Sequence, residues 1–536
     1  MTHPGEPVLR LEGLRVRYPG SDRATLDGLD LELGGGDRLA LVGPSGCGKS
    51  TVARAVLNLL PPGSVCEGGL LLNGVDPRRL AAPALRHLRG EAVGLVFQDP
   101  MTRLNPLLTI GEHLRDTLAA HRPAWRRRQV IGRARELLQR VGIDPARYAS
   151  YPHEFSGGMR QRLAIALAMA LRPPLVIADE PTTSLDVAVT AAVMAELCDL
   201  CSEAGSSLLL ISHDLAMAGR WCDRIAVLDG GRLVEQAPAR QLLLRPSSPV
   251  GQRLLAAARA REGGQRLAPA PGPALLEIED LRSWHPLPSL PWQPRWIRAV
   301  DGISLRLQAG ETIGLVGASG CGKSSLCRAL MGLAPVRCGR VLLEGRDLLS
   351  LRGRQLQRAR RRIQMVFQDP LACLNPQMTV GEAVADPLLI HGLAGRSEAR
   401  RLARQQLAAV GLDPPELFER RLPRQLSGGQ QQRVAIARAL ILQPQVLLCD
   451  ESVSMLDAEI QAEVLSLLAE LQQRLGLGML FVTHDLAVAS GFCHRVLVLE
   501  GGRVVEEGPG RALLAHPQAA ITRTLVEACP RLPELV

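Results

Sequence analysis

The stretch Gly43-Pro44-Ser45-Gly46-Cys47-Gly48-Lys49-Ser50 decides the fold of this chain. It fits the phosphate-binding pattern G-x-x-x-x-G-K-[ST]. Glycines allow successive backbone N–H groups to turn toward one anion, and a helix that begins at the loop presents its positive end to the same anion. In this pattern the lysine reaches the β- and γ-phosphates and the final hydroxyl ligates Mg²⁺. The stretch therefore predicts a site for a nucleoside triphosphate with Mg²⁺.

A second copy, Gly317-Ala318-Ser319-Gly320-Cys321-Gly322-Lys323-Ser324, begins 274 positions after the first. Each copy follows a short apolar run that is typical of a buried strand, 38–42 or 312–316. Each also precedes a helical pattern, which starts with Thr51 or Ser325. Two matches in the same strand–loop–helix context make a chance glycine-rich turn a poor explanation, so we expect two nucleotide sites.

Composition excludes several other classes of protein. Apolar residues make up 46% of the 536 residues but aromatic residues only 3%, which predicts aliphatic cores. We find no run of about 18 apolar residues and no signal peptide, and therefore expect a cytoplasmic protein that reaches a membrane only through a partner. The formal net charge is +10, with arginine clusters at 126–128 and 358–362. Without interleaved aromatic residues, these clusters favour solvated helix faces over a nucleic-acid surface; attraction to an anionic membrane is an alternative.

The second half of the chain repeats the first. Motif residues recur at offsets of 270 to 274 positions, as for Lys49 and Lys323 or Asp179 and Asp450. This spacing predicts a duplicated domain of about 260 residues. We expect domains at 1–262 and 274–536, joined by a Gly/Pro/Ala-rich linker at 263–273. The Pro/Trp-rich stretch 284–296 is expected to be a surface loop, or alternatively a partner contact.

Two further features carry polar side chains. Apolar runs at 175–178 and 446–449 end in the pairs Asp179-Glu180 and Asp450-Glu451. Because the carboxyl ends of buried parallel strands bind ligands, the first carboxylate suits Mg²⁺ and the second suits the water that attacks the γ-phosphate. By contrast, Cys198 and Cys201 form a lone C-x-x-C in a helical pattern, which favours helix packing over a metal site.

Each half also contains a serine and two glycines at the start of a long helix. These segments are Ser156-Gly157-Gly158-Met159 and Ser427-Gly428-Gly429-Gln430, and each offers a second phosphate-shaped helix N-terminus. With them, the sequence resembles the ATP-binding-cassette (ABC) ATPases, whose signature is L-S-G-G-Q. The resemblance covers essentially the whole chain and includes every core motif in order. It implies an α/β fold of two tandem P-loop NTPase domains, each with a RecA-like parallel-sheet core, an antiparallel β subdomain and a helical signature subdomain.

The resemblance further implies that the two halves pair head to tail within the chain around two ATP molecules. One site would combine Lys49, Ser50, Gln98, Asp179, Glu180 and His213 with Ser427, Gly428, Gly429 and Gln430. The other would combine Lys323, Ser324, Gln368, Asp450, Glu451 and His484 with Ser156, Gly157, Gly158 and Met159. The implied Mg²⁺ ligands are Ser50, Gln98 and Asp179 in one site and Ser324, Gln368 and Asp450 in the other.

Remaining roles also follow from the resemblance. Glu180 and Glu451 would polarise water, His213 and His484 would act as switch histidines, and Asp186 and Asp457 would belong to the D-loops. Tyr18 would stack on adenine in the first site, and His285 or Trp284 in the second. Met159 replaces the signature glutamine, but the backbone N–H groups are retained. Both sites keep their lysine, aspartate, glutamate and histidine, so we expect two hydrolytic sites.

The segments Phe97-Gln98-Asp99-Pro100 and Phe367-Gln368-Asp369-Pro370, with a degraded H-P-Y-T-R tail at 516–523, resemble the oligopeptide/dipeptide/nickel importer ATPases. This implies two transmembrane permeases, an extracytoplasmic solute-binding protein and a peripheral place on the cytoplasmic face of the inner membrane. The cargo would be a peptide, nickel or a related small solute. The alternative is a soluble twin-cassette ATPase acting on ribosomes or DNA, which the short Pro/Gly-rich linker and the lack of inserted cysteine pairs disfavour.

Overall fold

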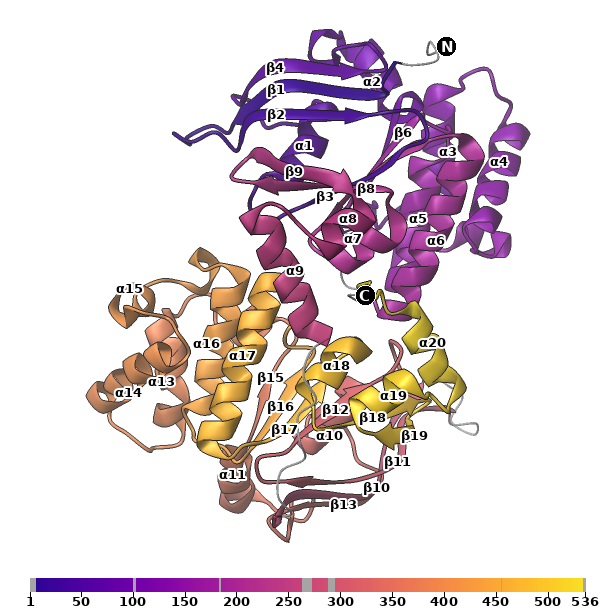
Figure 1. Ribbon diagram of the computed structural model, residues 1–536. Helices are drawn as coiled ribbons and strands as arrows, with labels where there is room; N and C mark the ends of the chain where they lie inside the picture. The colour runs from indigo at the N-terminus through magenta and orange to yellow at the C-terminus, as the bar shows by residue number, and fades with distance from the viewer. Residues whose placement is uncertain are drawn as a thin grey trace.

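The computed structural model describes residues 6–99, 103–182, 185–262, 272–287, 295–454 and 456–533. The chain forms two lobes, the first half above the second in Figure 1. Helix α9 ends the first lobe at Glu262 and strand β10 begins the second at Ala274. Residues 263–271 of the predicted linker lie outside the described residues. We call the lobes the first and second cassette.

The first cassette is built on a six-stranded sheet with the order β5-β6-β7-β3-β8-β9. All neighbouring strands in it are parallel except β8 and β9. Its strands are β3 (Arg38–Val42), β5 (Val93–Val96), β6 (Leu175–Asp179), β7 (Ser207–Ser212), β8 (Arg224–Asp229) and β9 (Arg232–Pro238). The phosphate-binding loop follows β3, the carboxylate pair stands at the end of β6 and His213 follows β7. The parallel arrangement therefore brings these segments to one edge of the sheet.

Both faces of this sheet are covered, which explains its continuous apolar strands. Side chains alternate between the faces, so Leu39 and Leu41 pack in one core and Ala40 and Val42 in another. The core of Leu39 contains helix α1 and an antiparallel sheet of β1 (Leu9–Arg17), β2 (Leu26–Leu33) and β4 (Val65–Leu72), in the order β2-β1-β4. The other core is formed against helices.

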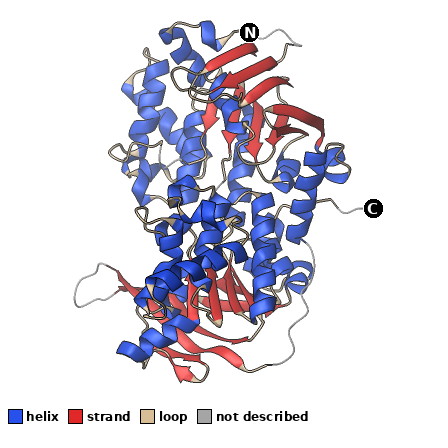
Figure 2. Ribbon diagram, turned by 90° about the vertical axis from the view of Figure 1, so that its left-hand side faces the viewer, coloured by secondary structure: helices blue, strands red, loops and turns tan. Residues whose placement is uncertain are grey.

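The helices of the first cassette surround this sheet. They are α1 (Lys49–Val56), α2 (Ala82–Glu91), α3 (Ile110–His121), α4 (Arg127–Arg140), α5 (Gly157–Ala168), α6 (Val187–Ala204), α7 (Leu215–Trp221), α8 (Ala239–Leu244) and α9 (Pro249–Glu262). Helices α3 to α9 contribute side chains to the second core. Figure 2 shows that helices fill the region between the strands of the two lobes.

The second cassette repeats this architecture. Its core sheet has the order β15-β16-β17-β12-β18-β19, and its antiparallel sheet has the order β11-β10-β13-β14. The strands are β10 (Ala274–Leu287), β11 (Arg295–Gln308), β12 (Thr312–Val316), β13 (Cys338–Leu343), β14 (Arg346–Asp347), β15 (Ile363–Val366), β16 (Val446–Asp450), β17 (Gly478–Val482), β18 (Arg495–Glu500) and β19 (Arg503–Gly508). The helices are α10 (Lys323–Leu330), α11 (Gly353–Arg362), α12 (Pro370–Cys373), α13 (Val380–Ile390), α14 (Arg396–Ala409), α15 (Pro415–Glu419), α16 (Gly428–Leu440), α17 (Ala458–Leu475), α18 (Leu486–Phe492), α19 (Gly510–Ala515) and α20 (Ala520–Ala528).

We expected a surface loop at 284–296, but the two ends of this stretch pair with each other as strands, which corrects that expectation. Strand β10 continues to Leu287 and β11 begins at Arg295, with Trp284 opposite Arg298. The guanidinium groups of Arg298 and Arg337 each lie 4.8 Å from the centre of the Trp284 ring. Such cation–π contacts favour the paired strands over an open loop. Residues 288–294 lie outside the described residues.

The last helix of each cassette packs on the other cassette. Helix α9 contacts α17 and α18, and α20 contacts α6 (Figure 1). The Arg220 Nη1 donates hydrogen bonds to the carbonyl oxygens of Glu527, at 3.1 Å, and Ala528, at 2.9 Å. An ion pair of 3.5 Å joins Arg253 Nε and Glu459 Oε1. These reciprocal contacts hold the two sheet edges face to face.

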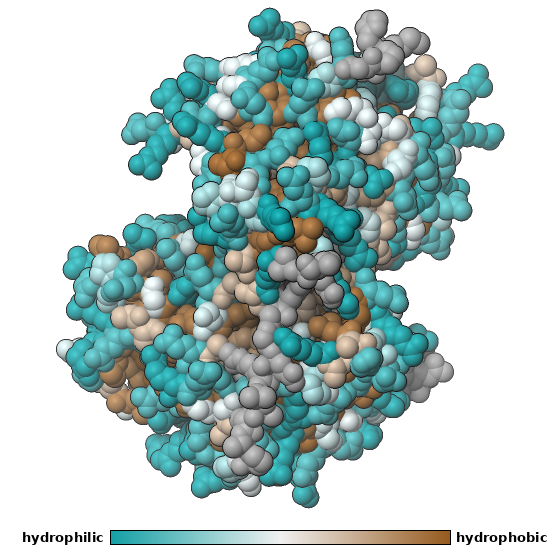
Figure 3. Space-filling model, viewed as in Figure 1, coloured by the Kyte–Doolittle hydropathy of each residue, from teal (hydrophilic) through white to brown (hydrophobic). Residues whose placement is uncertain are grey.

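Hydrophilic residues dominate the outer surface of both lobes on the face shown in Figure 3. Among the described helices, none combines the length and the apolar character needed to cross a bilayer.

Candidate functional site

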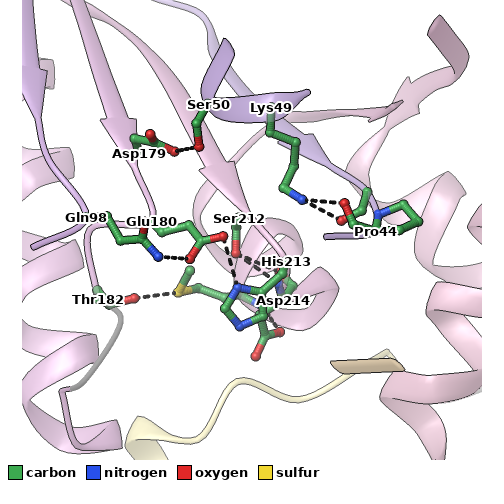
Figure 4. Close-up of polar contacts among 12 residues, drawn as sticks. Pro44, Lys49, Ser50, Gln98, Asp179, Glu180, Thr182, Ser212, His213 and Asp214 are labelled. Carbon is green, nitrogen blue, oxygen red and sulfur yellow. Dashed lines mark hydrogen bonds and ion pairs between the residues drawn. The ribbon is translucent and has the colours of Figure 1, made fainter. Parts of the chain in front are cut away.

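The first phosphate-binding loop joins β3 to α1. Gly48 precedes α1 with a φ of 108°, and a Cβ there would lie 2.8 Å from the carbonyl oxygen of Thr25, so only glycine fits. The Lys49 Nζ donates to the carbonyl oxygens of Gly43, at 2.7 Å, and Pro44, at 2.9 Å (Figure 4). The loop therefore holds the Lys49 ammonium group beside the N-terminus of α1. With a nucleotide bound, phosphate oxygens would replace the two carbonyl oxygens as its partners.

A hydroxyl and a carboxylate meet at the start of α1. The Ser50 Oγ donates to Asp179 Oδ1 at 3.0 Å, across the gap between α1 and the end of β6 (Figure 4). Burial raises the pKa of Asp179, because the charged carboxylate is poorly solvated there. A nearby cation would offset this cost. Two hard oxygen ligands of this kind fit Mg²⁺.

Glu180 follows in a backbone conformation that non-glycine residues seldom adopt. Its φ is 46°, and its N–H donates to the carbonyl of Ile211 at 3.0 Å. Left-handed conformations cost about 1–3 kcal/mol and often occur at functional sites. The turn points the carboxylate toward two neighbours: Gln98 Nε2 donates to Oε2 at 2.8 Å, and His213 Nδ1 lies 3.3 Å from Oε1 (Figure 4). The sequence predicted these three residues but not the strained backbone that orients the first of them.

The second cassette reproduces each of these contacts. Glu451 has a φ of 47°, and burial raises the pKa of Asp450. The polar contacts are Lys323 Nζ to Gly317 O at 2.8 Å, Ser324 Oγ to Asp450 Oδ1 at 2.8 Å, Gln368 Nε2 to Glu451 Oε2 at 2.8 Å and His484 Nδ1 to Glu451 Oε2 at 3.9 Å. Six predicted residues of each cassette thus lie together at one sheet edge.

A cavity of about 550 Å³ lies where the first site faces the second cassette. Ser45, Gln98, Glu180 and His213 line it from one side, and the signature residues Ser427 to Gly429 line it from the other. Thr182 and Asp214, which were not among the predicted site residues, also lie in the wall of this cavity. The described structure therefore places a phosphate-binding loop and the opposite signature around one space.

The second site has a smaller cavity, of about 250 Å³. Its wall includes Ser319, Gly320 and Gly322 to Ser325 of the second loop, together with Gln368, Glu451 and His484, and Asp186 of the first cassette closes it. The Asp186 Oδ2 accepts a hydrogen bond from the backbone N–H of Ser319 at 3.1 Å. Within the described residues, the wall of this cavity does not include Ser156 to Gly158.

Comparison with known proteins agrees with this geometry. The ABC transporter family profile matches residues 26–183 and 300–454, which is more than half of the chain. The chain belongs to the ABC transporter family. Both its cassettes match, so it is an ABC ATPase with two cassettes fused in one chain, and the predicted family, α/β fold class and ATPase class are confirmed.

Relatives align with this ABC ATPase over nearly its whole length. The peptidoglycan transport ATP-binding protein YejF of Agrobacterium fabrum is 41% identical, over 91% of this chain and 90% of its own length. The glutathione import ATP-binding protein GsiA of Pectobacterium atrosepticum is 38% identical, over 92% of this chain and 84% of its own. Among solved structures, cbiO1 from Clostridium perfringens covers 45% of this chain and 91% of its own, at 28% identity and a TM-score of 0.40.

The two signatures of this ABC ATPase differ in their caps. Ser156 accepts from the N–H of Met159 and Ser427 from that of Gln430, each at 3.4 Å. Gln430 also accepts from the N–H of Ser427 and so completes a capping box. Met159 has no side-chain acceptor for that bond; instead, its sulfur lies 3.6 Å from Nη1 of Arg147. The first signature keeps its helix cap but loses one of the two reciprocal bonds.

The predicted adenine-stacking positions are equivalent in the backbone. Tyr18 lies five residues after Gly13, which has a φ of 55°, and His285 lies five residues after Asp280, which has a φ of 43°. The Tyr18 hydroxyl is 3.2 Å from Thr51 Oγ1, beside the first loop. Trp284 is engaged by the two arginines described above. His285 is therefore the better matched of the two predicted positions.

The loop cysteines are poor nucleophiles. Cys47 and Cys321 are buried, and burial raises the pKa of each thiol despite the adjacent lysine. Since the thiolate is the reactive form, both side chains act in packing at the base of the loop.

Proposed function

We propose that this ABC ATPase is the motor of an importer for peptide-like solutes and works with two composite ATP sites. The cavity that joins Ser45 and Glu180 of one cassette to Ser427–Gly429 of the other is the observation that carries the proposal. It supports a mechanism in which ATP binding draws the cassettes together. The names of the relatives, which mention peptidoglycan transport and glutathione import, support the direction and the class of solute.

The chemistry follows from the residues at the sheet edge. Lys49 and the loop N–H groups would bind the phosphates, and Ser50 and Asp179 would hold Mg²⁺, which supplies charge neutralisation at the phosphate oxygens. Glu180 would accept a proton from the attacking water, because its carboxylate is fixed by Gln98 and His213. Lys323, Ser324, Asp450, Glu451, Gln368 and His484 would have the same roles in the second site.

The proposal includes partners. Two transmembrane permeases and an extracytoplasmic solute-binding protein would complete the importer, and the ATPase would lie on the cytoplasmic face of the inner membrane. ATP-driven changes in the distance between cassettes would be passed to the permeases. The proposed domain limits are 1–262 and 274–536.

The test is purification of the full chain from its own cells with the substitutions Glu180→Gln and Glu451→Gln, which are expected to hold the ATP-bound complex together. We expect permeases to copurify, and ATP hydrolysis by the wild-type complex in vesicles to rise with binding protein loaded with a short peptide. Binding protein loaded with Ni²⁺ instead is the matched control. Copurification with ribosomes in place of permeases would contradict the importer and favour the soluble alternative.

A further inference from the structure

A cluster of two histidines and one glutamate lies outside the nucleotide sites. His87 and Glu91 belong to α2 and His121 ends α3, so the cluster joins two helices of the first cassette (Figure 1). One potential ligand atom from each residue lies within 4.8 Å of the other two. Among the described residues, this is the one group of three or more such side chains close enough to share a metal ion.

The backbone of α2 aims Glu91 at the histidines. The helix is interrupted at Arg89 and at Gly90, where φ is 109°. A Cβ at Gly90 would lie 3.1 Å from Nε2 of the His121 ring, so glycine lets the ring pack directly on the chain. This leaves Nδ1 of His121 facing the carboxylate, 3.6 Å from Glu91 Oε1.

The position and exposure of these side chains suit a metal ion. The Nδ1 of His121 is buried and has no hydrogen-bond partner. His87 is 61% exposed and Nδ1 lies 3.7 Å from Glu91 Oε1, so a small rotation of its side chain can bring the third ligand inward. Zinc–nitrogen bonds of about 2.0–2.1 Å place two ligands at most about 4.2 Å apart.

We propose that His87, Glu91 and His121 bind a divalent transition-metal ion of the zinc type. Two imidazoles and one carboxylate are a ligand set that zinc accepts, with a fourth position left for water. A bound ion would connect α2 to α3, the helices on either side of the segment that carries Gln98. It would thus tie the C-terminal end of α2 to the C-terminal end of α3.

The second cassette provides a natural control at the equivalent place. With the offset of 270 positions that relates β5 to β15 and α3 to α13, the cluster corresponds to Gln357, Arg361 and His391. The guanidinium of Arg361 lies close enough to contribute, after burial, to a lowered pKa of His391. The positively charged Arg361 thus occupies the position equivalent to that of Glu91. The equivalent cluster has one potential metal ligand, His391, where the first cassette has three.

Arg122 competes with the ion. Its Nη1 donates to Glu91 Oε1 at 2.6 Å, and its side chain is 37% exposed. A metal ion has to displace this guanidinium or bind next to its positive charge. Removal of the arginine is therefore expected to tighten metal binding.

The test uses the full chain, freed of metal with a chelator and titrated with Co²⁺ in excess Mg²⁺, which competes for sites made of oxygen ligands. We expect one Co²⁺ per chain, with an absorption spectrum that lacks thiolate charge-transfer bands. Of the twelve cysteines, Cys338 is exposed and most of the others are buried, which limits their competition. His87→Ala and His121→Ala should each lower the affinity at least tenfold.

The controls are His391→Ala, which should leave the affinity unchanged, and Arg122→Ala, which should raise it. His87 is exposed, so its replacement leaves the fold intact even if His121→Ala perturbs packing. Affinity that stays the same in both histidine variants of the first cassette, or a spectrum with thiolate bands, would overturn the proposal. So would a weaker affinity in Arg122→Ala.

Discussion

The two nucleotide sites are alike in the residues that one cassette contributes and differ in what the opposite cassette contributes. Glu180 of the first cassette and Glu451 of the second have nearly the same φ, 46° and 47°, and each accepts a hydrogen bond from a glutamine. Across the junction, the first site faces the signature residues Ser427–Gly429 in a cavity of about 550 Å³, whereas the second is closed by Asp186 in about 250 Å³. The residues at one sheet edge are positioned by the fold of their own cassette. The rest of each site depends on how the two cassettes are placed relative to each other, and nucleotide binding can change this placement.

The largest effect is expected from a variant that removes the glutamate carboxylate from both sites. Glu180→Gln together with Glu451→Gln keeps the shape of both side chains but removes the carboxylate that accepts the proton. We expect steady-state ATP hydrolysis to fall by about 10²–10⁴-fold, while ATP affinity measured by equilibrium binding stays within a few-fold. Unchanged turnover in this variant would refute the assigned proton acceptor.

A moderate effect on ATP binding is expected to distinguish the two cassettes. Asp186 and Asp457 cap α6 and α17 through equal bonds of 3.0 Å, but Asp186 also accepts from Ser319 across the junction. Loss of the cap alone costs about 1 kcal/mol in either cassette. A hydrogen bond to a charged group is worth about 1.5–3 kcal/mol, so Asp186→Ala should weaken ATP binding at the second site by about tenfold more than Asp457→Ala weakens binding at the first.

The comparison requires each variant to be measured with the opposite phosphate-binding lysine replaced, so that one site is observed at a time. Lys49→Ala isolates the second site and Lys323→Ala the first. Equal losses from the two aspartate variants would show that the contact to Ser319 contributes nothing to binding.

The smallest effect concerns stability. Burial raises the pKa of Asp450, so the ionised carboxylate destabilises the metal-free fold at neutral pH, and this cost disappears as the pH falls through the raised pKa. Asp450→Asn removes the charge and keeps an oxygen for Ser324. Without metal and nucleotide, we expect Tm to rise by about 2–4 °C at pH 7, the shift that about 1 kcal/mol produces in a domain of this size. Differential scanning calorimetry at pH 7 and pH 5 checks this, and the gain should shrink at the lower pH.

Local sequence patterns predicted much of the fold and of each half-site. The glycine-lysine-serine loops and the apolar runs ending in Asp-Glu placed strands, helix starts and ligands at one sheet edge, because these patterns reflect short-range geometry. The positive φ of Glu180 has no such signal, since it follows from the hydrogen bond to Ile211 on a neighbouring strand. The strand pairing beyond Trp284 was also missed, because the Pro/Trp-rich pattern carries no signal of the cation–π contacts that Trp284 makes with Arg298 and Arg337.

Relations between the lobes were predicted only through the resemblance. Nothing in the local pattern of Asp186 distinguishes it from Asp457, and both stand before a helix as caps. The contact of Asp186 with Ser319, and the absence of a corresponding signature in the wall of the second cavity among the described residues, arise from the relative placement of the lobes. That placement depends on α9 and α20, whose contacts join residues distant in the chain.

The central claim is that each ATP site is completed by the opposite cassette of the same chain. The most direct test counts ATP molecules retained per chain in the Glu180→Gln, Glu451→Gln background. Lys49→Ala combined with Ser427→Arg damages one site twice, and one ATP should remain. Lys49→Ala combined with Ser156→Arg damages both sites, and no ATP should remain. The reverse pattern, with ATP retained only in the second combination, would contradict the account.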